Sequence, residues 1–362
     1  MYRLVQRTII ALWVILILQS VSVAADVRQT ADIKLPNPTG THAVGTFSVL
    51  LVDESRDEPA TAEADARKLA IQVWYPAKLN AGPTPERAPY FSNLEAYEST
   101  WGNQRVQLLQ RIKTNSYLRV ECADADHPFP VILFSHGWQS TRFLYSSMLE
   151  DLASHGFIVV GIDHPYMGSV LIGGKVTPSR EDQFATPEQL LEHYAADVSF
   201  VIDELARFNT THAQLAQRID LERVGAMGHS NGFLPVMAAA QADNRIKAAL
   251  VHDKFENELA FLFQSNIPLL LFKTESAETP SQSFFDQSTA DLYFLELAAK
   301  HSSCSDPSIL ESNSDAAARK SLELIKRYTA RYFTRYLGNA ANDSIEIDEA
   351  DRDRVRIKAA EN

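Results

Sequence analysis

The feature that most constrains the fold is a series of short apolar runs that begins after Pro130. Five runs of four to six residues are almost purely apolar: 131–134, 157–162, 224–227, 248–251 and 267–272. Runs of this kind are typical of strands buried on both faces of a parallel sheet. Helix-prone stretches separate them, so the sequence predicts a mostly parallel, doubly wound α/β sheet.

Two β-rich runs precede this alternation, at residues 46–52 and 69–75. An acidic, turn-like segment joins them and Pro76 ends the second, which predicts an antiparallel hairpin at the start of the sheet. The clearest helix is expected over residues 187–208, because Thr186 and Gln189 have capping-box spacing and Pro187 occupies the first helical position. Further helices are expected over residues 145–154 and 316–337.

The first 25 residues have the composition of a secretory signal peptide. Arg3 and Arg7 precede an apolar core at residues 9–18, and small residues lead up to Asp26. We expect cleavage before Asp26 and export to the periplasm or the medium. The alternative is an uncleaved membrane anchor, for which the apolar run is marginally long enough.

The rest of the chain is expected to be one hydrolase-sized domain, residues 26–338, followed by a charged tail at residues 339–362 that should lie loosely on the surface. Residues 89–126 contain aromatic side chains, a helical pattern near residues 106–112 and no clear strand. They are expected to form an insertion, either a lid-like pocket wall or a plain surface segment.

Composition excludes some classes of function. A net charge of −12 with no basic cluster argues against nucleic-acid binding. Export makes a disulfide between Cys122 and Cys304 possible, and the sequence leaves that pairing open. Two cysteines without nearby ligands argue against a structural zinc site, and no cofactor or metal is expected. The acidic residues at 124–126, which precede His127, are interpreted as a turn.

The catalytic candidate is Ser230. Residues 228–232 have the sequence G-H-S-N-G, which follows a predicted strand and precedes a helix-prone run at residues 234–241. A sharp turn from strand to helix exposes the serine hydroxyl in hydrolases that contain G-x-S-x-G, and places it at the positive end of the helix. The predicted fold is therefore the α/β-hydrolase fold.

Serine needs a neighbouring base, and in this fold the chain order is serine, acid, histidine. His252 and His301 are the histidines downstream of Ser230, and only His301 leaves room for an acid in between. Two acids follow predicted strands, Asp253 and Glu275, and the spacing alone does not decide between them.

Acyl transfer also needs N–H donors for the oxyanion. We expect them at Asn231, directly after the nucleophile, and at Trp138, in the loop after the first parallel strand. His136 is interpreted as a support for this loop. Asp163 and His164, at the next strand end, are interpreted as supporting or structural residues.

Four stretches resemble platelet-activating-factor acetylhydrolase, the group VII phospholipase A2 family: residues 73–77, 134–137, 152–159, and 218–220 with the elbow at 228–230. The resemblance extends over about residues 45–337. It implies Asp253 as the acid rather than Glu275, because the family places its acid at the strand end nearer the nucleophile. It also implies an aspartate five residues after the histidine, which Asp306 supplies, and an insertion that walls the pocket.

The resemblance has departures. Asn231 and Phe233 replace an apolar residue and a glycine near the elbow, and Lys254 replaces an apolar or aromatic residue. These changes bear on lipid preference. The expected function is that of a metal-independent carboxylic-ester hydrolase acting on short or oxidised acyl chains of phospholipids. The aromatic residues of the insertion, Tyr90, Phe91, Tyr97 and Trp101, are expected to contact an acyl chain or, transiently, a membrane surface. A general short-chain esterase, a polyester hydrolase or a dienelactone-type hydrolase is the alternative. A binding protein on an inactive hydrolase scaffold is the alternative of another class.

Overall fold

The computed structural model describes residues 32–61, 64–80, 82–180, 184, 186–254, 266–274, 277–308, 316–338 and 345–360. The chain divides into two units, Met1–Asp32 and Ile33–Asn362. The predicted signal peptide lies outside the described residues, so the fold below is that of the second unit. No helix in the described ranges combines the length and apolarity needed to cross a membrane.

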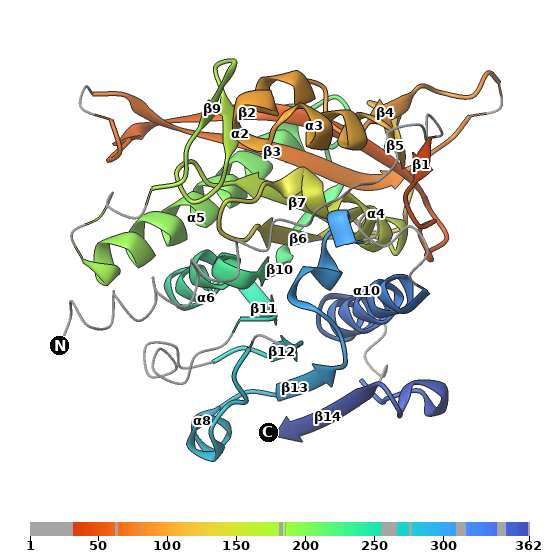
Figure 1. Ribbon diagram of the computed structural model, residues 1–362, viewed down its shortest axis with the longest axis vertical. Coiled ribbons are helices and arrows are strands. Elements are labelled where there is room, and N and C mark those ends of the chain that lie inside the picture. The colour runs from red at the N-terminus through yellow and green to blue at the C-terminus, as the bar shows by residue number, and fades with distance from the viewer. Residues whose placement is uncertain are drawn as a thin grey trace. The chain divides into compact units, whose positions relative to one another are not determined.

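Strands in the described part of the chain form one twelve-stranded sheet in the order β1-β5-β2-β3-β7-β6-β10-β11-β12-β13-β14, with β4 paired to β5 (Figure 1). The bounds are β1 Ile33–Lys34, β2 Ala43–Asp57, β3 Ala66–Ala77, β4 Arg87–Pro89, β5 Ile112–Leu118, β6 Phe129–Ser135, β7 Ile158–Asp163, β10 Ile219–His229, β11 Ile246–His252, β12 Leu269–Lys273, β13 Leu292–Leu297 and β14 Val355–Ala360. A separate small hairpin consists of β8 Val170–Ile172 and β9 Lys175–Thr177.

The predicted parallel sheet is confirmed. The five apolar runs correspond to β6, β7, β10, β11 and β12, and each pairs in parallel with its neighbours among them. The predicted hairpin is β2 with β3, paired antiparallel from Ala43–Ala77 onward. The fold is the α/β-hydrolase fold that the sequence predicted.

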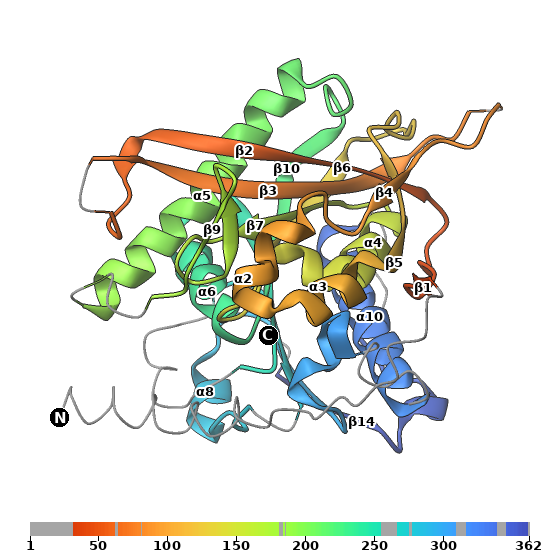
Figure 2. The ribbon, with the colours of Figure 1, turned by 45° about the horizontal axis from the view of Figure 1, so that its top comes forward.

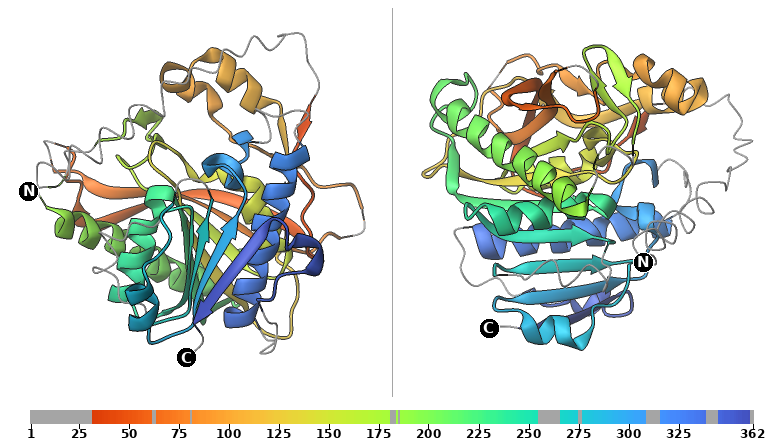
Figure 3. Two further views of the ribbon diagram at one scale, coloured as in Figure 1. Left: turned by 60° about the horizontal axis from the view of Figure 1, so that its bottom comes forward. Right: turned by 90° about the vertical axis from the view of Figure 1, so that its left-hand side faces the viewer.

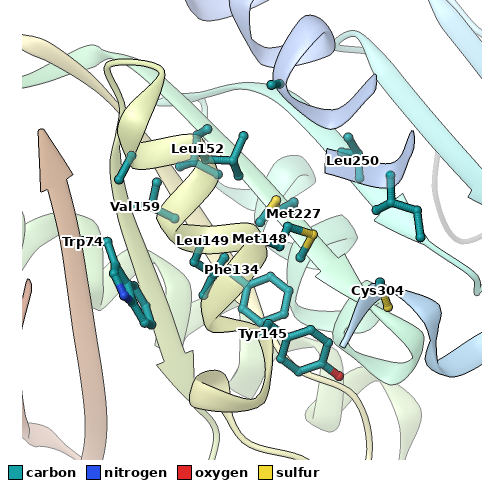
Figure 4. Close-up of a cluster of buried hydrophobic side chains, with 14 of the residues drawn as sticks. Trp74, Phe134, Tyr145, Met148, Leu149, Leu152, Val159, Met227, Leu250 and Cys304 are labelled. Atoms are coloured by element: carbon teal, nitrogen blue, oxygen red, sulfur yellow. The ribbon is translucent and has the colours of Figure 1, made fainter. Parts of the chain in front are cut away.

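Helices cover both faces of this sheet (Figure 3). On one face, α4 Ser146–Ser154 and α10 Ala316–Leu337 pack in a core cluster that also contains Ile132 and Phe134 (Figure 4). On the other, α5 Pro187–Thr211 and α6 Phe233–Ala242 pack in a cluster with Val131 and Leu133. Successive residues of β6 thus point to opposite faces, as strand geometry requires.

The capping prediction for α5 is confirmed. The Thr186 side chain accepts a hydrogen bond from the Gln189 N–H, and Pro187 lies in the first turn. The helices at residues 145–154 and 316–337 correspond to η2 Arg142–Tyr145 with α4, and to α10. The open question of the disulfide is also answered, because Cys122 and Cys304 are free and buried in opposite core clusters.

Two predictions were wrong. Residues 345–360 of the tail do not lie loosely: they end in β14, which pairs antiparallel with β13 and closes that edge of the sheet. The charged side chains of β14 concealed it, because an edge strand with an exposed face need not be apolar. Residues 89–126 do contain a strand, β5, which joins β2 and β1 in parallel.

The insertion also contains η1 Leu94–Tyr97, α2 Glu98–Trp101 and α3 Asn103–Gln110 (Figure 2). Its aromatic side chains gather on Phe143 of η2. Phe91 stacks on that ring with centroids 4.3 Å apart, and Tyr97 meets it edge-on while stacking on Trp101 at 4.3 Å. Such a cluster of large rings holds the insertion against the segment that follows β6.

Candidate functional site

Ser230 occupies a strained turn between β10 and α6. Strand β10 ends at His229, and Ser230 begins the short helix η3 Ser230–Gly232 that leads into α6. Its backbone has φ +53°, a left-handed conformation that costs a non-glycine residue roughly 1–3 kcal/mol. In a nucleophile elbow, the serine adopts such a strained conformation on a sharp strand-to-helix turn, which exposes its hydroxyl. The backbone at Ser230 therefore has the geometry that the sequence predicted.

The two glycines of the elbow are required by close backbone approaches. A β-carbon on Gly228 would lie 2.2 Å from the Gly232 carbonyl oxygen, and one on Gly232 would lie 2.1 Å from the Ser135 carbonyl oxygen. Neither contact is possible for a side chain. The G-x-S-x-G pattern thus follows from how tightly the turn folds on itself and on the end of β6.

His301 and Asp253 are in direct contact. The His301 Nδ1 lies 2.6 Å from Asp253 Oδ2, although the two residues are 48 positions apart. Asp253 directly follows β11 and has φ +50°, while His301 begins the short helix η4 His301–Cys304. The imidazole is 28% exposed, whereas the Asp253 carboxylate is only 1% exposed. A proton on Nδ1 would be donated to this carboxylate, which leaves Nε2 as the acceptor.

Asp253 is held as a carboxylate. Its Oδ1 accepts hydrogen bonds from the backbone N–H groups of Thr274 at 2.7 Å and Ala277 at 3.2 Å. Burial raises the pKa of Asp253, but the hydrogen bonds from His301 and Thr274 outweigh burial and lower the pKa to about 2. The rival acid, Glu275, lies outside the described residues.

The loop that carries His301, called the base loop below, lies beside His229, the residue that precedes Ser230. The ring centroids of His229 and His301 are 4.6 Å apart, and His229 Nε2 lies 3.1 Å from the His301 carbonyl oxygen. His229 also lies 2.8 Å, through Nδ1, from the hydroxyl of Tyr145. Nothing in the sequence indicated this link through His229 and Tyr145, because an aromatic ring at either position is equally consistent with plain packing in the hydrophobic core.

The loop after β6 lies directly against the elbow. Strand β6 pairs with β10 up to Ser135–Gly228, and a β-carbon on Gly137 would come within 3.1 Å of the Ser230 β-carbon. The next residue, Trp138, is partly buried, as is Asn231. The structure therefore brings the segments of both expected oxyanion donors to the serine.

His136 supports this loop from inside. It is fully buried, and its ring bonds the Gly137 carbonyl at 2.8 Å and the His164 N–H at 3.1 Å. Burial lowers the pKa of His136 to about 3. A neutral, sealed imidazole fits the supporting role expected for it.

A second serine–histidine–aspartate chain lies in the core. His164 bonds Ser135 Oγ at 3.0 Å and Asp197 at 2.9 Å, and Arg67 pairs with Asp197 at 2.7 Å. Burial raises the pKa of Asp197, but Arg67 and His164 outweigh it and hold the pKa well below its usual range. All four side chains are essentially inaccessible, so this chain anchors the end of β6.

Asp306 anchors the other end of the base loop. It is fully buried, accepts hydrogen bonds from Tyr90 Oη at 3.0 Å and from the Ser147 hydroxyl, and its own N–H donates to Leu144. Burial raises its pKa to about 7. Asp306 thus ties the segment after His301 to the insertion and to the start of α4.

Other candidate ligands have structural partners. Asp124 pairs with Lys78 and Arg218, each at 2.7 Å, as expected for a surface turn. Asp163 pairs with Arg142 in the core. Across the described ranges, no group of three or more His, Cys, Asp or Glu side chains is arranged to hold a metal ion.

Two family models match the chain. Residues 27–171 match the model described as platelet-activating factor acetylhydrolase, isoform II, and residues 120–355 match the model described as PET hydrolase-like. The first match confirms the resemblance drawn from the sequence. The second extends over more than half of the chain and includes Ser230, Asp253 and His301.

Curated relatives point the same way. The chain is 30% identical over 139 residues to a probable 1-alkyl-2-acetylglycerophosphocholine esterase of Arthroderma benhamiae, which is 35% of this chain and 32% of that protein. It is 24% identical over 294 residues to the platelet-activating factor acetylhydrolase of Canis lupus familiaris, 70% of this chain and 62% of that one. The matches thus span less than two thirds of these relatives.

A solved structure has the same fold. A ferulic acid esterase from Streptomyces cinnamoneus superimposes with a TM-score of 0.74 and 24% sequence identity, over 90% of this chain and 99% of that one. At this identity, the likeness concerns the fold.

Proposed function

Because the chain belongs to the PET hydrolase-like family of α/β-hydrolases, we propose that it is a carboxylic-ester hydrolase that works through an acyl-enzyme on Ser230. One observation carries the proposal most directly. An imidazole and a buried carboxylate that lie far apart in sequence meet at 2.6 Å, and the imidazole packs on His229, the residue before a serine held at φ +53°. A serine, an oriented base and a low-pKa acid are the parts that acyl transfer requires.

These positions support the following mechanism. The Ser230 hydroxyl attacks the ester carbonyl while His301 Nε2 takes its proton, and Asp253 stabilises the imidazolium that forms. The N–H groups of Trp138 and Asn231 donate to the oxyanion. The tetrahedral intermediate then collapses, the ester C–O bond breaks and His301 returns the proton to the leaving alkoxide. Water repeats the sequence on the acyl-enzyme and frees the acid.

For the substrate we propose esters of short acyl chains, with phospholipids that carry a short or oxidised acyl chain as the favoured class. The two curated relatives named above support this class, since one is named an acetylglycerophosphocholine esterase and the other a platelet-activating factor acetylhydrolase. The aromatic cluster of the insertion would wall the acyl pocket, and its partly exposed members Phe91 and Trp101 would make transient contact with a membrane surface. A polyester hydrolase is the second candidate, favoured by the match of residues 120–355 to the PET hydrolase-like model.

We also propose that residues 1–25 direct export and are removed, which leaves a mature hydrolase chain that begins at Asp26. N-terminal sequencing of protein recovered from the periplasm or the medium tests this. A chain that begins at Asp26 supports the proposal, and one that retains Met1 contradicts it.

The substrate proposal is tested with a series of p-nitrophenyl esters from acetate to dodecanoate, together with a short-chain and a long-chain phosphatidylcholine. Wild type should show its highest kcat/KM on the shortest acyl chains, and Ser230→Ala should lose at least about 10³-fold in kcat. A polyester film assayed in parallel decides for the second candidate if soluble products appear there but not from the phospholipids. Folded wild type that binds esters and cleaves none would make the protein an inactive binding scaffold.

A further inference from the structure

Three segments must keep their relative positions if the proposed reaction is to occur: the elbow, the loop of the oxyanion donors and the loop of His301. The structure joins all three through one chain of hydrogen bonds that contains Tyr145 and His229. Neither residue has a role in the mechanism above. The inference that follows rests on the proposed function.

Tyr145 connects the oxyanion loop to the elbow. Its hydroxyl accepts a hydrogen bond from the Ser140 hydroxyl at 3.3 Å, and it lies 2.8 Å from His229 Nδ1. Its ring is fully buried and packs on Phe134 with centroids 4.6 Å apart (Figure 4). The hydroxyl is therefore held at a fixed point by the core.

His229 connects the elbow to the base loop, and its partners determine its tautomer. A carbonyl oxygen only accepts, so His229 Nε2 carries the proton that is donated to the His301 carbonyl at 3.1 Å. Burial, together with the neighbouring His301, holds the pKa of His229 well below its ordinary value, so the ring is neutral. Nδ1 is then an acceptor, and the Tyr145 hydroxyl donates to it.

His301 is held at its ring and at its backbone by different partners. Asp253 holds the ring through Nδ1 and so fixes its rotation, but it does not fix the backbone that carries the ring. The His301 carbonyl is the backbone group next to that ring, and it accepts hydrogen bonds from His229 Nε2 at 3.1 Å and from the weak donor Cys304 Sγ at 3.8 Å. A shift of about 1 Å in a catalytic group lowers a rate about 10²-fold.

We propose that Tyr145 and His229 are positioning residues that hold the His301 backbone to the elbow and to the oxyanion loop. Their contribution acts on kcat, because it aligns His301 Nε2 with Ser230 in the transition state. It leaves KM nearly unchanged, because neither side chain is placed to bind the substrate. A role confined to core stability would lower the melting temperature alone.

Tyr145→Phe removes one hydroxyl and keeps the buried ring. We expect kcat on p-nitrophenyl acetate to fall about three- to tenfold with KM within about twofold, the effect of one lost hydrogen bond. The matched control is Tyr75→Phe. Tyr75 lies on β3, is also fully buried, and donates a hydrogen bond to the Val120 carbonyl at 2.6 Å. It should lower the melting temperature similarly and leave kcat unchanged.

A second pair of variants separates the hydrogen bond from the ring. His229→Gln keeps a donor near the position of Nε2 and should retain kcat within about threefold, whereas His229→Leu loses both bonds and should lower kcat about tenfold or more. Hydrogen–deuterium exchange over residues 299–306 should quicken in Tyr145→Phe and in His229→Leu, and should match wild type in Tyr75→Phe.

The proposal is overturned if Tyr145→Phe lowers the melting temperature as Tyr75→Phe does while kcat stays at the wild-type value. An inactive wild type would instead refute the proposed function. In that case the exchange measurement alone decides, and unchanged exchange over residues 299–306 in Tyr145→Phe refutes the anchoring.

Discussion

Asp253→Asn is the most informative substitution at the proposed site. The amide keeps an oxygen to accept the hydrogen bonds of the Thr274 and Ala277 N–H groups, at 2.7 and 3.2 Å, so the loop should keep its shape. Its NH2 group, however, faces His301 Nδ1 across the 2.6 Å contact and donates where the carboxylate accepted. The ring must then carry its proton on Nε2, the wrong atom for a base toward Ser230.

The expected magnitude follows from two losses. The base is in the wrong tautomer, and the imidazolium loses a buried carboxylate whose pKa of about 2 shows how strongly it is stabilised as an anion. Loss of the equivalent acid in a serine hydrolase lowers kcat about 10⁴-fold, which corresponds to about 5.5 kcal/mol in the activation barrier. We expect a fall of about 10³- to 10⁴-fold for Asp253→Asn.

The assay is steady-state hydrolysis of p-nitrophenyl acetate, with circular dichroism to verify the fold. The matched control is Glu275→Gln, which tests the other acid that the spacing allowed and should keep kcat within about twofold. If Glu275→Gln abolished turnover while Asp253→Asn retained it, the assignment of the acid would be wrong even though the 2.6 Å contact exists.

Three further predictions concern stability. The free energy of unfolding of Ser230→Gly should be about 1 kcal/mol higher than that of Ser230→Ala, because only the alanine keeps a β-carbon at φ +53°. Urea denaturation measures this difference, and equal midpoints would refute the backbone strain. Gly232→Ala should cost more than about 2 kcal/mol, since its β-carbon meets the Ser135 carbonyl at 2.1 Å, whereas Gly102→Ala, with open space around it, should cost about 1 kcal/mol in the same assay. Asp306 has a pKa raised to about 7, so native protein should lose stability as pH rises from about 4 to about 7, and Asp306→Asn should flatten that slope in pH-dependent melts; an unchanged slope would contradict the buried, protonated acid.

Much of the fold was predictable because its signals are local. The five central strands are buried on both faces, so each is a continuous apolar run, and α5 has its cap at Thr186 and its proline at the first turn. Strand β14 was missed because edge strands need no apolar run, and β5 because the four residues from Lys113 to Ser116 in its middle are all polar.

The candidate site could be proposed from the sequence where the chemistry demands one residue type at one place in the chain order. Ser230 and His301 follow from the elbow and from the order of the triad, whereas the spacing left Asp253 and Glu275 equal until the family resemblance favoured Asp253. Tyr145 gave no such signal, because its partner His229 is 84 residues away. Asp306 was singled out by the family resemblance alone, because its partner Ser147 is 159 residues away. Contacts of that range exist only once the sheet is assembled.

The claim that Ser230 is an activated nucleophile is tested most directly with a fluorophosphonate. Its phosphorus forms a bond to the serine oxygen as the P–F bond breaks, so the adduct is covalent and its position can be read by peptide mass spectrometry. We predict one adduct per chain, on the peptide that contains Ser230, and none in Ser230→Ala. Folded wild-type protein that gains no adduct, or gains it on another residue, would contradict the account.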